Sequence, residues 1–343
     1  MLPTAPSLNR FASQRSSELL GTGLLVLAGA LVMALVIDYF LGEPSERWHP
    51  VVWMGRYLDW AALRFAPQHE SITDSQQNKR RVFWQGAMYW SLGAVVFSAL
   101  FAGVELLARS LHPLIAVGLL GLALKPLLAM AMLCSEVAAV DAALDQSLAQ
   151  GRERLSRLVS RDTQHLIESQ VREAAIETLA ENLNDSVVSP IFWFVLGGLP
   201  AAALYRFANT ADAMWGYKGM RDRRDWRYAG KWAARADDVL SWPGARLTAA
   251  VVWLLYKGQF EWALLRQEAR KTPSPNSGWP MAAFALALGI KLEKPGVYSL
   301  NADANTVLDE HFGQALFLAR NVMLFVVFFA LLAIILVANL DSM

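Results

Sequence analysis

ETLAENLNDSVVSP (residues 177–190) joins an acidic, amide-rich helix directly to an apolar segment, and much of the expected architecture follows from this junction. Glu177, Glu181 and Asp185 recur every four residues, a spacing that places them on one face of a helix. Like charges at this spacing repel each other, and ions are costly beside the run 187–205, which is apolar enough to enter a membrane. We therefore expect a cationic group to complete a site on this row of carboxylates.

The composition is that of a membrane protein. Of the 343 residues, 55% are hydrophobic, and the mean hydropathy is +0.30. At about 1.5 Å per residue, the apolar ranges 19–39, 83–107 and 321–340 are each long enough to cross roughly 30 Å of hydrocarbon. The range 113–133 is a fourth candidate, but Lys125 and Pro126 interrupt it, so we expect this Lys to face protein or water.

Charge and motif content argue against several common functions. The formal net charge is +1, which gives no general affinity for nucleic acid. Cys134 is the only cysteine, so it forms no intrachain disulfide, and we expect it to pack in the core. The sequence has no GxxxxGK[ST] loop, GxGxxG turn, HExxH motif or CxxC pair, which disfavours a common kinase or zinc enzyme.

Basic residues predict the topology. The loop between the first two spans is rich in Lys and Arg, so the positive-inside rule makes it cytoplasmic and the N-terminus external. Its basic residues are Arg47, Arg56, Arg64, Lys79, Arg80 and Arg81. The charged region 136–184 is then also cytoplasmic, and its pattern indicates two amphipathic helices of soluble character.

The run 187–205 is predicted to be re-entrant. The region after it is again basic, so both of its ends should stay on the cytoplasmic side. Pro190, the Gly197–Gly198 pair and Pro200 interrupt it, which suits a kinked element packed within protein better than a lipid-facing span. The stretch 247–265 is ambiguous, while 272–294 is predicted as a loop followed by a short apolar helix.

The predicted fold class is all-α. We expect a polytopic integral membrane protein with about four to six transmembrane or re-entrant helices and cytoplasmic helical loops. Residues 1–343 should form a single membrane-embedded catalytic domain. Within it, 1–18 is an N-terminal tail, and the cytoplasmic segments 135–186 and 206–246 carry most of the polar site.

The first polar patch follows the first span, and the second is the acidic helix itself. In residues 38–56, turns imposed by Gly and Pro concentrate Asp38, Glu43, Arg47, His49 and Arg56 near the membrane surface. The alternative is an interfacial belt anchored by Trp48 and Trp53. At the acidic helix, Asn182 and Asn184 favour ligand contacts or Mg²⁺ coordination by oxygen, against the alternative of a solvated helix end.

Two further patches follow. Residues 209–246 combine Lys and Arg, which suit phosphate, with an Asp237–Asp238 pair that suits a metal; the alternative is a topogenic loop that binds anionic lipid heads. SPNSGWP (274–280) is predicted to be a rigid turn. It either presents Asn276 to a ligand or only connects the elements on its two sides.

In this order the patches resemble the membrane-bound adenosylcobinamide-phosphate synthase family of cobalamin biosynthesis, the CobD/CbiB family. The resemblance runs from about residue 35 to residue 290. It rests on LGEPSERWHPVVWMGR (41–56), VSRDT (159–163), AAIETLAENLNDSVVSPIFW (174–193), YRFANTADAMWGYK (205–218), AARADDVLSWPGARLTA (233–249) and SPNSGWPMAAFALALG (274–289).

The resemblance implies an ATP-dependent amide ligation in cobalamin biosynthesis. Adenosylcobyric acid, a corrinoid substrate, would be joined to aminopropanol phosphate or aminopropanol, giving adenosylcobinamide phosphate or adenosylcobinamide. An acyl phosphate is the expected intermediate, with ATP as co-substrate and Mg²⁺ as cofactor. A bacterial cytoplasmic (inner) membrane location, a site facing the cytoplasm, and a homo-oligomer or a complex with other corrinoid enzymes are further expectations.

Candidate roles follow for individual residues. The catalytic candidates are Glu177, Glu181 and Asp185. The metal candidates are Glu181, Asp185, Asp237 and Asp238. The substrate or phosphate candidates are Asn182, Asn209, Asp212, Lys218, Arg235, Arg246, Asn276, His49 and Arg56. Trp48, Trp215 and Trp279 are candidates for flat contact with the corrin ring, although Trp commonly anchors a protein at the membrane interface.

Two alternatives come from other classes. A membrane transporter or a scaffold for corrinoid intermediates would also use Lys125, broken helices and acidic loops. The sequence shows no two related halves, and its polar residues concentrate in loops rather than at mid-span, which favours the enzyme. A degenerate assembly platform is disfavoured because the acidic and basic positions are retained.

Overall fold

A computed structural model describes residues 5–68 and 75–340 of the chain, with side chains from residue 23 onward. Within these ranges, five helices are long and apolar enough to cross a membrane. Three are unbroken, namely α1 (Ala5–Leu41), α3 (Gln76–Arg109) and α13 (Glu310–Leu340). They confirm the three spans expected at 19–39, 83–107 and 321–340, and the all-α class.

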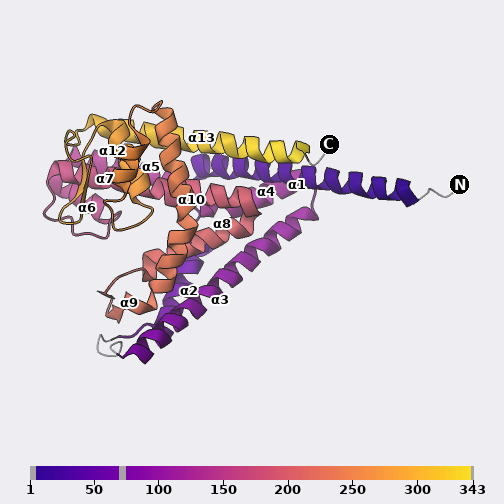
Figure 1. The fold of residues 1–343 in the computed structure, drawn as a ribbon, viewed down its shortest axis with the longest axis horizontal. Coiled ribbons are helices and arrows are strands. Elements are labelled where there is room, and N and C mark those ends of the chain that lie inside the picture. The colour runs from indigo at the N-terminus through magenta and orange to yellow at the C-terminus, as the bar shows by residue number, and fades with distance from the viewer. Residues whose placement is uncertain (1–4, 69–74, 341–343) are drawn as a thin grey trace.

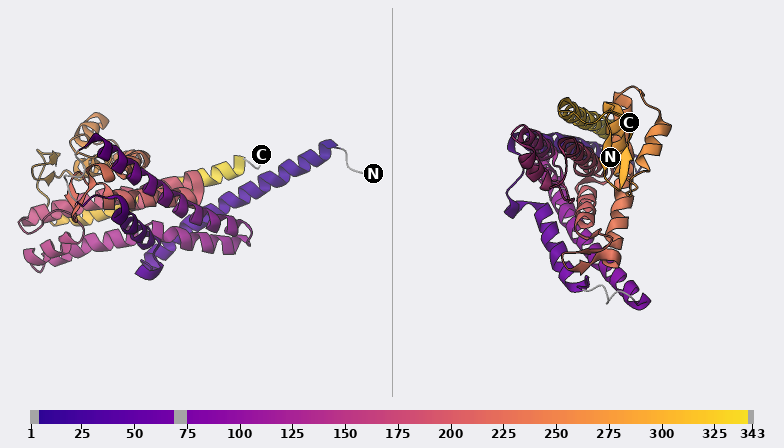
Figure 2. Two further views of the ribbon diagram at one scale, coloured as in Figure 1. Left: turned by 90° about the horizontal axis from the view of Figure 1, so that it is seen from below. Right: turned by 90° about the vertical axis from the view of Figure 1, so that its left-hand side faces the viewer.

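Shorter elements gather at one end of these long helices. Figure 1 shows α1, α4 and α13 running side by side, while α3 slants away with α2 and α10 crosses the bundle. The ends of α1 and α13 project on one side, opposite α6, α7 and α12 (Figures 1 and 2). The remaining helices are α2 (Pro50–Phe65), α4 (Pro113–Leu124), α5 (Met130–Leu144), α6 (Leu148–Ser156), α7 (Glu168–Leu183), α8 (Ser189–Trp215), α9 (Trp226–Ala229), α10 (Lys231–Leu255), α11 (Trp262–Ala269) and α12 (Gly278–Leu288).

The few strands form two small antiparallel hairpins. β1 (Met220–Arg221) pairs with β2 (Arg224–Asp225) in the basic loop after α8. β3 (Leu292–Lys294) pairs with β4 (Tyr298–Leu300), and β3 packs against α7. The short apolar helix predicted after residue 272 is α12, and the ambiguous stretch 247–265 is the end of α10, a turn and the start of α11.

Lys125 interrupts the fourth span, as predicted. α4 ends at Leu124, a short 3₁₀ turn covers Lys125–Leu127, and α5 begins at Met130. The Lys125 side chain is buried, with Nζ 3.3 Å from Asp38 Oδ1 and 2.6 Å from Glu43 Oε2. Asp38 also accepts a 2.8 Å hydrogen bond from the Ala131 amide. The charges are thus paired inside the protein, which is how a membrane-depth Lys is tolerated.

The run 187–205 folds back on itself. Gly197 and Gly198 have non-helical backbone angles in the middle of α8. On either side of this break, Arg206 Nη1 donates to Ser186 Oγ at 3.0 Å, and Asn209 Nδ2 donates to Asp185 Oδ2 at 3.2 Å. Residues about equally far before and after the break are therefore in contact, so the segment is a helical hairpin. The predicted turn back at the Gly–Gly pair is confirmed.

The hairpin tip depends on a glycine and on a carboxylate from α3. Gly198 has φ +65° and ψ −159°, a region that is almost exclusive to glycine. Glu105 Oε2 accepts a 2.9 Å hydrogen bond from the Leu199 amide, which begins the second half of the hairpin. A Cβ on residue 198 would overlap this carboxylate.

We expect Gly198→Ala to lower the free energy of unfolding by about 1–3 kcal/mol, because the new side chain meets both backbone strain and the Glu105 carboxylate. The measurement is denaturant or thermal unfolding of the purified protein in detergent. Gly103→Ala in α3 is the matched control, since a Cβ there enters open space in a regular helix. Equal stability of the two variants would contradict this account of the tip.

The prediction of two amphipathic, soluble helices in 136–184 holds for α6, which has one buried and one exposed face, and is wrong for α7. The region forms the end of α5, then α6 and α7, and α7 is buried on almost every side, with all of residues 171–180 in the interior. α5, α6, α12, α13 and β3 surround it. Some of its polar side chains have partners on these neighbours, for example Glu173, which accepts a 3.1 Å hydrogen bond from the Glu293 amide on β3. A polarity pattern along one helix does not reveal such partners.

Candidate functional site

The carboxylate row of α7 divides between two polar compartments. Glu177 and Glu181 line a small pocket of about 160 Å³ on one side of the helix. Asp185 lies beyond the end of α7, in a five-residue π-helical turn (Asn184–Val188) where the chain enters the hairpin. Such turns recur at functional sites because one extra residue changes where the following side chains point.

The small pocket has mixed charge. Arg161 forms an ion pair with Glu177, whose other oxygen, Oε1, is buried without a hydrogen-bond partner. Lys294 at the end of β3 and Tyr298 at the start of β4 complete the wall. Burial, and then the charge of Glu177, raise the pKa of the Tyr298 hydroxyl, so this phenol stays protonated and can donate a hydrogen bond.

The cations expected beside Glu177 and Glu181 are therefore Arg161 and Lys294. Arg161, Lys294 and Tyr298 were not among the site residues predicted from the sequence. Arg161 belongs to the VSRDT block, which carried the family resemblance, so that block already held the signal. Lys294 and Tyr298 come from a hairpin more than 100 residues away, and no local pattern links them to α7. Asn182 lines the same pocket, with its amide donating to the Thr178 carbonyl at 3.0 Å.

The second compartment is acidic. Asp185 accepts hydrogen bonds from Asn184 at 2.7 Å and from Asn209 at 3.2 Å. Asp237 on α10 faces the same space, close enough to Asp185 and Asp212 for their charges to repel. Ser241 Oγ donates to Asp237 Oδ1 at 3.2 Å. The hairpin therefore brings Asp185, Asn209 and Asp212 together with α10, as the predicted site required.

The carboxyl groups of Asp237 and Asp238 in this compartment have raised pKa values. Burial, followed by the charges of Asp185 and Asp212, raises the pKa of Asp237 well above its usual value. Burial also raises the pKa of Asp238, although the charge of Lys218 opposes the shift. A nearby cation favours the ionised form of a carboxyl group whose pKa is raised, so this cluster is suited to bind positive charge.

A metal ion bound at this cluster would need ligands besides these side chains. Among the described residues, no three Asp, Glu, His or Cys side chains converge closely enough to enclose a metal by themselves. Mg²⁺ in phosphate-transfer sites commonly takes one or two carboxylates and completes its shell with phosphates and water. Asp185 and Asp237 fit that smaller requirement, whereas Glu181 faces the mixed-charge pocket.

Other predicted residues have structural roles. Asn276 is buried and uses both amide atoms, since Oδ1 accepts from Arg246 and Nδ2 donates to the Asp238 carbonyl at 2.8 Å. His49 caps α2, with Nδ1 accepting from the Val51 amide and Nε2 3.1 Å from Glu43. Both side chains therefore make hydrogen bonds within the protein, and their predicted roles in substrate binding stay predictions.

The basic and aromatic candidates are dispersed. Lys218, Arg235 and Arg56 have exposed side chains. Trp215 is wrong as a corrin contact, because it is buried between Phe65 and Trp226. Among them, Lys218 still lies close enough to Asp238 for their charges to attract.

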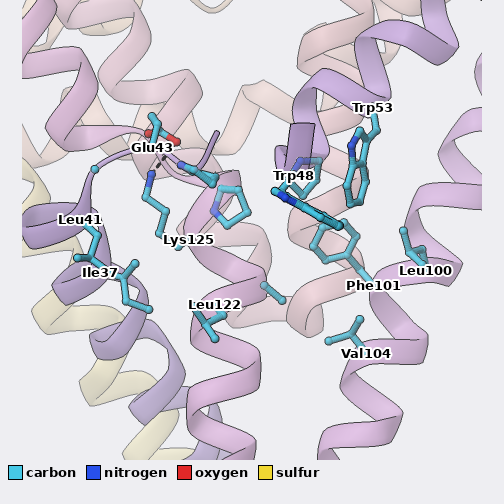
Figure 3. A pocket seen from close by; sticks show the side chains of 15 residues that line it. Ile37, Leu41, Glu43, Trp48, Trp53, Leu100, Phe101, Val104, Leu122 and Lys125 are labelled. Carbon is cyan, nitrogen blue, oxygen red and sulfur yellow. Dashed lines mark ion pairs between the residues drawn. The ribbon is translucent and has the colours of Figure 1, made fainter. Parts of the chain in front are cut away.

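Trp48 belongs to an apolar pocket of about 430 Å³ between α1, α2, α3 and α4. Figure 3 shows Lys125 directed at Glu43 at one end of it, with Trp48 and Phe101 on the opposite side. Burial acts to raise the pKa of Glu43, but hydrogen bonds from His49 and Lys125 outweigh it and hold that pKa below its usual value. Glu43 is therefore ionised, and the polar end of the pocket is an ion pair.

Comparisons with known proteins agree with this architecture. The family model described as CobD/Cbib protein matches residues 31–337. The probable cobalamin biosynthesis protein CobD of Methanothermobacter thermautotrophicus is 37% identical over 277 residues, covering 79% of this chain and 85% of the relative. Cobalamin biosynthesis protein CobD of Brucella anthropi is 35% identical over 280 residues, covering 78% of this chain and 82% of the relative.

A third relative, cobalamin biosynthesis protein CobD of Dehalococcoides mccartyi, is 32% identical over 304 residues, which cover 84% of this chain and 92% of the relative. No solved structure matches the chain. Matches of this length and identity, on a fold with several membrane-spanning helices, establish the family. This multi-pass membrane protein belongs to the CobD/CbiB family of cobalamin biosynthesis proteins.

Proposed function

We propose that this protein catalyses an ATP-dependent amide ligation between adenosylcobyric acid and aminopropanol phosphate or aminopropanol. One observation carries the proposal: the row Glu177, Glu181 and Asp185 joins a small mixed-charge pocket to an acidic compartment suited to a cation. A ligase of this kind must hold an amine substrate beside the phosphates of ATP, and two adjoining polar compartments meet that need.

The small pocket suits the amine substrate. A volume of about 160 Å³ limits it to a small molecule. Arg161 and Lys294 would bind the phosphate of aminopropanol phosphate, and Glu181 would bind its ammonium group. An amine attacks only after losing a proton, so Glu181 would also accept that proton as general base.

The acidic compartment suits the activation step. The propionate carboxylate of the corrinoid would take the terminal phosphoryl group of ATP, releasing ADP and forming an acyl phosphate. The amine nitrogen then forms the C–N bond, inorganic phosphate leaves with the C–O bond electrons, and Glu181 holds the proton. Mg²⁺, held by Asp185 and Asp237, would supply charge neutralisation for the phosphates.

The test is reconstitution of the reaction. The protein, purified in detergent, is incubated with adenosylcobyric acid, ATP, Mg²⁺ and aminopropanol phosphate or aminopropanol, and the corrinoid product is identified by mass alongside ADP. A product heavier by the amine minus water, formed with stoichiometric ADP, is expected. If no substrate combination consumes ATP while a labelled corrinoid crosses proteoliposomes, the protein is a transporter and the ligase proposal is wrong.

The Mg²⁺ requirement should depend on pH. Because the pKa of Asp237 is raised, this group holds its proton to a higher pH than an ordinary carboxyl group does, and a protonated carboxyl binds cations poorly. The Mg²⁺ concentration for half-maximal turnover should therefore fall as the pH rises through this pKa. Asp237→Asn should need more Mg²⁺ and should show a flatter dependence. Mg²⁺ titrations of both proteins at several pH values check this, and an unchanged pH dependence in Asp237→Asn would contradict it.

We further propose an inner-membrane location with the site facing the cytoplasm. The basic hairpin after α8 supports it, since Lys218, Arg221, Arg223 and Arg224 lie there together. In intact cells a Lys218→Cys variant should react with a membrane-impermeant thiol reagent only after the inner membrane is opened. The buried native Cys134 gives little background. Labelling of intact spheroplasts from outside would reverse the orientation.

A further inference from the structure

A cleft of about 630 Å³ between α10, α11 and the turn before α12 is lined by arginine and tryptophan side chains. Its arginines are Arg246, Arg266 and Arg270, and its tryptophans are Trp242, Trp262 and Trp279. The volume lies within the usual range for small-molecule sites. Of these six residues, Arg246 and Trp279 were already candidates from the sequence.

Helical spacing builds the two walls. On α10, Asp238, Trp242 and Arg246 follow one another at intervals of four, and on α11 and its C-terminal cap Trp262, Arg266 and Arg270 do the same. Residues at this spacing share a helix face and lie about 6 Å apart along the axis. Each wall therefore presents tryptophan and arginine to the same space.

The cations of the cleft have no anionic partner in the protein. Among residues 23–68 and 75–340, whose side chains the structure describes, no carboxylate lies within ion-pair distance of Arg246, Arg266 or Arg270, whereas neighbouring Lys271 is paired with Glu268 at 2.7 Å. Arg246 is held in place, since Nη2 donates to the Pro275 carbonyl at 2.9 Å and Nη1 donates to Asn276. Arg246 is therefore preorganised, and a group of unpaired guanidinium ions is suited to bind phosphate.

The aromatic rings of the cleft indicate a second property of its ligand, namely a planar group. The Arg246 guanidinium lies 4.8 Å from the centre of the Trp242 ring and 4.9 Å from that of Trp279. Trp262 lies 5.7 Å from Trp279, and the Trp242 and Trp262 side chains are both exposed to the cleft. Exposed indole faces next to arginines favour a ligand that joins a planar ring to phosphate groups.

The cleft adjoins the acidic compartment. Asn276 connects them directly, because it accepts from Arg246 and donates to the carbonyl of Asp238 at 2.8 Å. Asp238 also stands one helical turn before Trp242 on the same face of α10. A phosphate chain bound by the arginines therefore has a short route toward Asp238 and Asp237.

We propose that this cleft binds a nucleoside polyphosphate, with its base against the tryptophans and its phosphates on Arg246, Arg266 and Arg270, directed toward Asp237 and Asp238. This inference rests on the proposed ligase function, and it places the ATP site on α10 and α11 rather than at Lys218 or Arg235. An anionic lipid headgroup shares the phosphate chemistry, so the test separates the two sources.

The experiment measures binding without turnover. The full chain is placed in nanodiscs of phosphatidylcholine alone or with phosphatidylglycerol, and a non-hydrolysable ATP analogue with Mg²⁺ is titrated while tryptophan fluorescence and calorimetric heat are recorded. The variants are Arg266→Ala/Arg270→Ala and the control Arg64→Ala. Arg64 is a matched control because it also stacks on a tryptophan, 3.6 Å from the Trp60 ring centre, but lies outside the cleft.

Saturable binding in phosphatidylcholine, weakened at least about tenfold in the double variant and unchanged in Arg64→Ala, is the expected result. Equal affinity of the double variant and the wild type would overturn the cleft as the nucleotide site while leaving the ligase proposal intact. If the analogue does not bind and the double variant instead loses phosphatidylglycerol that co-purifies with the wild type, the cleft is a lipid site and the inference is overturned. Ligation with ADP release, measured separately, decides the proposed function.

Discussion

Asp185→Asn is expected to slow corrinoid amide formation by about 10²- to 10³-fold while leaving the protein folded. Asp185 occupies the junction between α7 and the hairpin, where Asn184 and Asn209 orient its two oxygens. Asparagine has nearly the same size, so packing is preserved, but the negative charge that would hold a cation beside Asp237 is lost. The measurement is the rate of product formation at saturating ATP, with a melting curve for each protein.

The control for this prediction is Asp145→Asn. Asp145 is exposed at the end of α5, away from both compartments, so the same chemical change there should leave the rate and the melting temperature unaltered. A rate for Asp185→Asn close to that of the control would remove Asp185 from the catalytic set. The mixed-charge pocket, which uses Glu177 and Glu181, would then be the remaining candidate for the chemistry.

Lys125→Met is expected to lower the free energy of unfolding by about 3–5 kcal/mol. Lys125 is 3% exposed and pairs with both Asp38 and Glu43, so its removal leaves the buried Asp38 without this cation and Glu43 with its contact to His49 alone. The Met side chain fills similar volume, which separates the loss of charge from the loss of packing. Unfolding of the purified protein in mixed detergent, followed by circular dichroism, measures the change.

Two further variants test whether the loss of stability in Lys125→Met comes from the unpaired buried charges. Arg157→Met removes an ion pair with Glu153 in which both side chains are largely exposed, and it should change stability by no more than about 1 kcal/mol. Combining Lys125→Met with Asp38→Asn and Glu43→Gln should recover much of the lost stability, since no buried charge then remains unpaired. If Lys125→Met lowers the free energy of unfolding as little as Arg157→Met does, the buried cluster contributes little to stability.

Several features of the fold were predictable from local sequence. The apolar ranges predicted the spans because their lengths match a bilayer. Lys125 in mid-span predicted that this side chain faces protein or water, and in the structure it faces Asp38 and Glu43. The Gly197–Gly198 pair predicted the turn back because glycine alone readily adopts the backbone angles found at Gly198.

The environment of α7 could not be predicted in the same way. Its alternating charges indicated an amphipathic helix, yet five neighbouring elements cover it. Whether a Glu is solvated or buried depends on whether a partner such as Arg161 reaches it, and that partner is positioned by the fold. Trp215 shows the converse, since a tryptophan suited to bind a flat ligand is instead enclosed by Phe65 and Trp226.

The amino-acid sequence by itself determined the membrane class, the broken helices and the row Glu177, Glu181 and Asp185, because each depends on the period or length of a local pattern. Only the tertiary structure decided that this row divides between two compartments, that Arg161 and Lys294 face one of them, and that Asp237 faces the other. The physical reason is that burial and charge pairing depend on neighbours distant in sequence, and a local sequence pattern does not specify which residues those neighbours are.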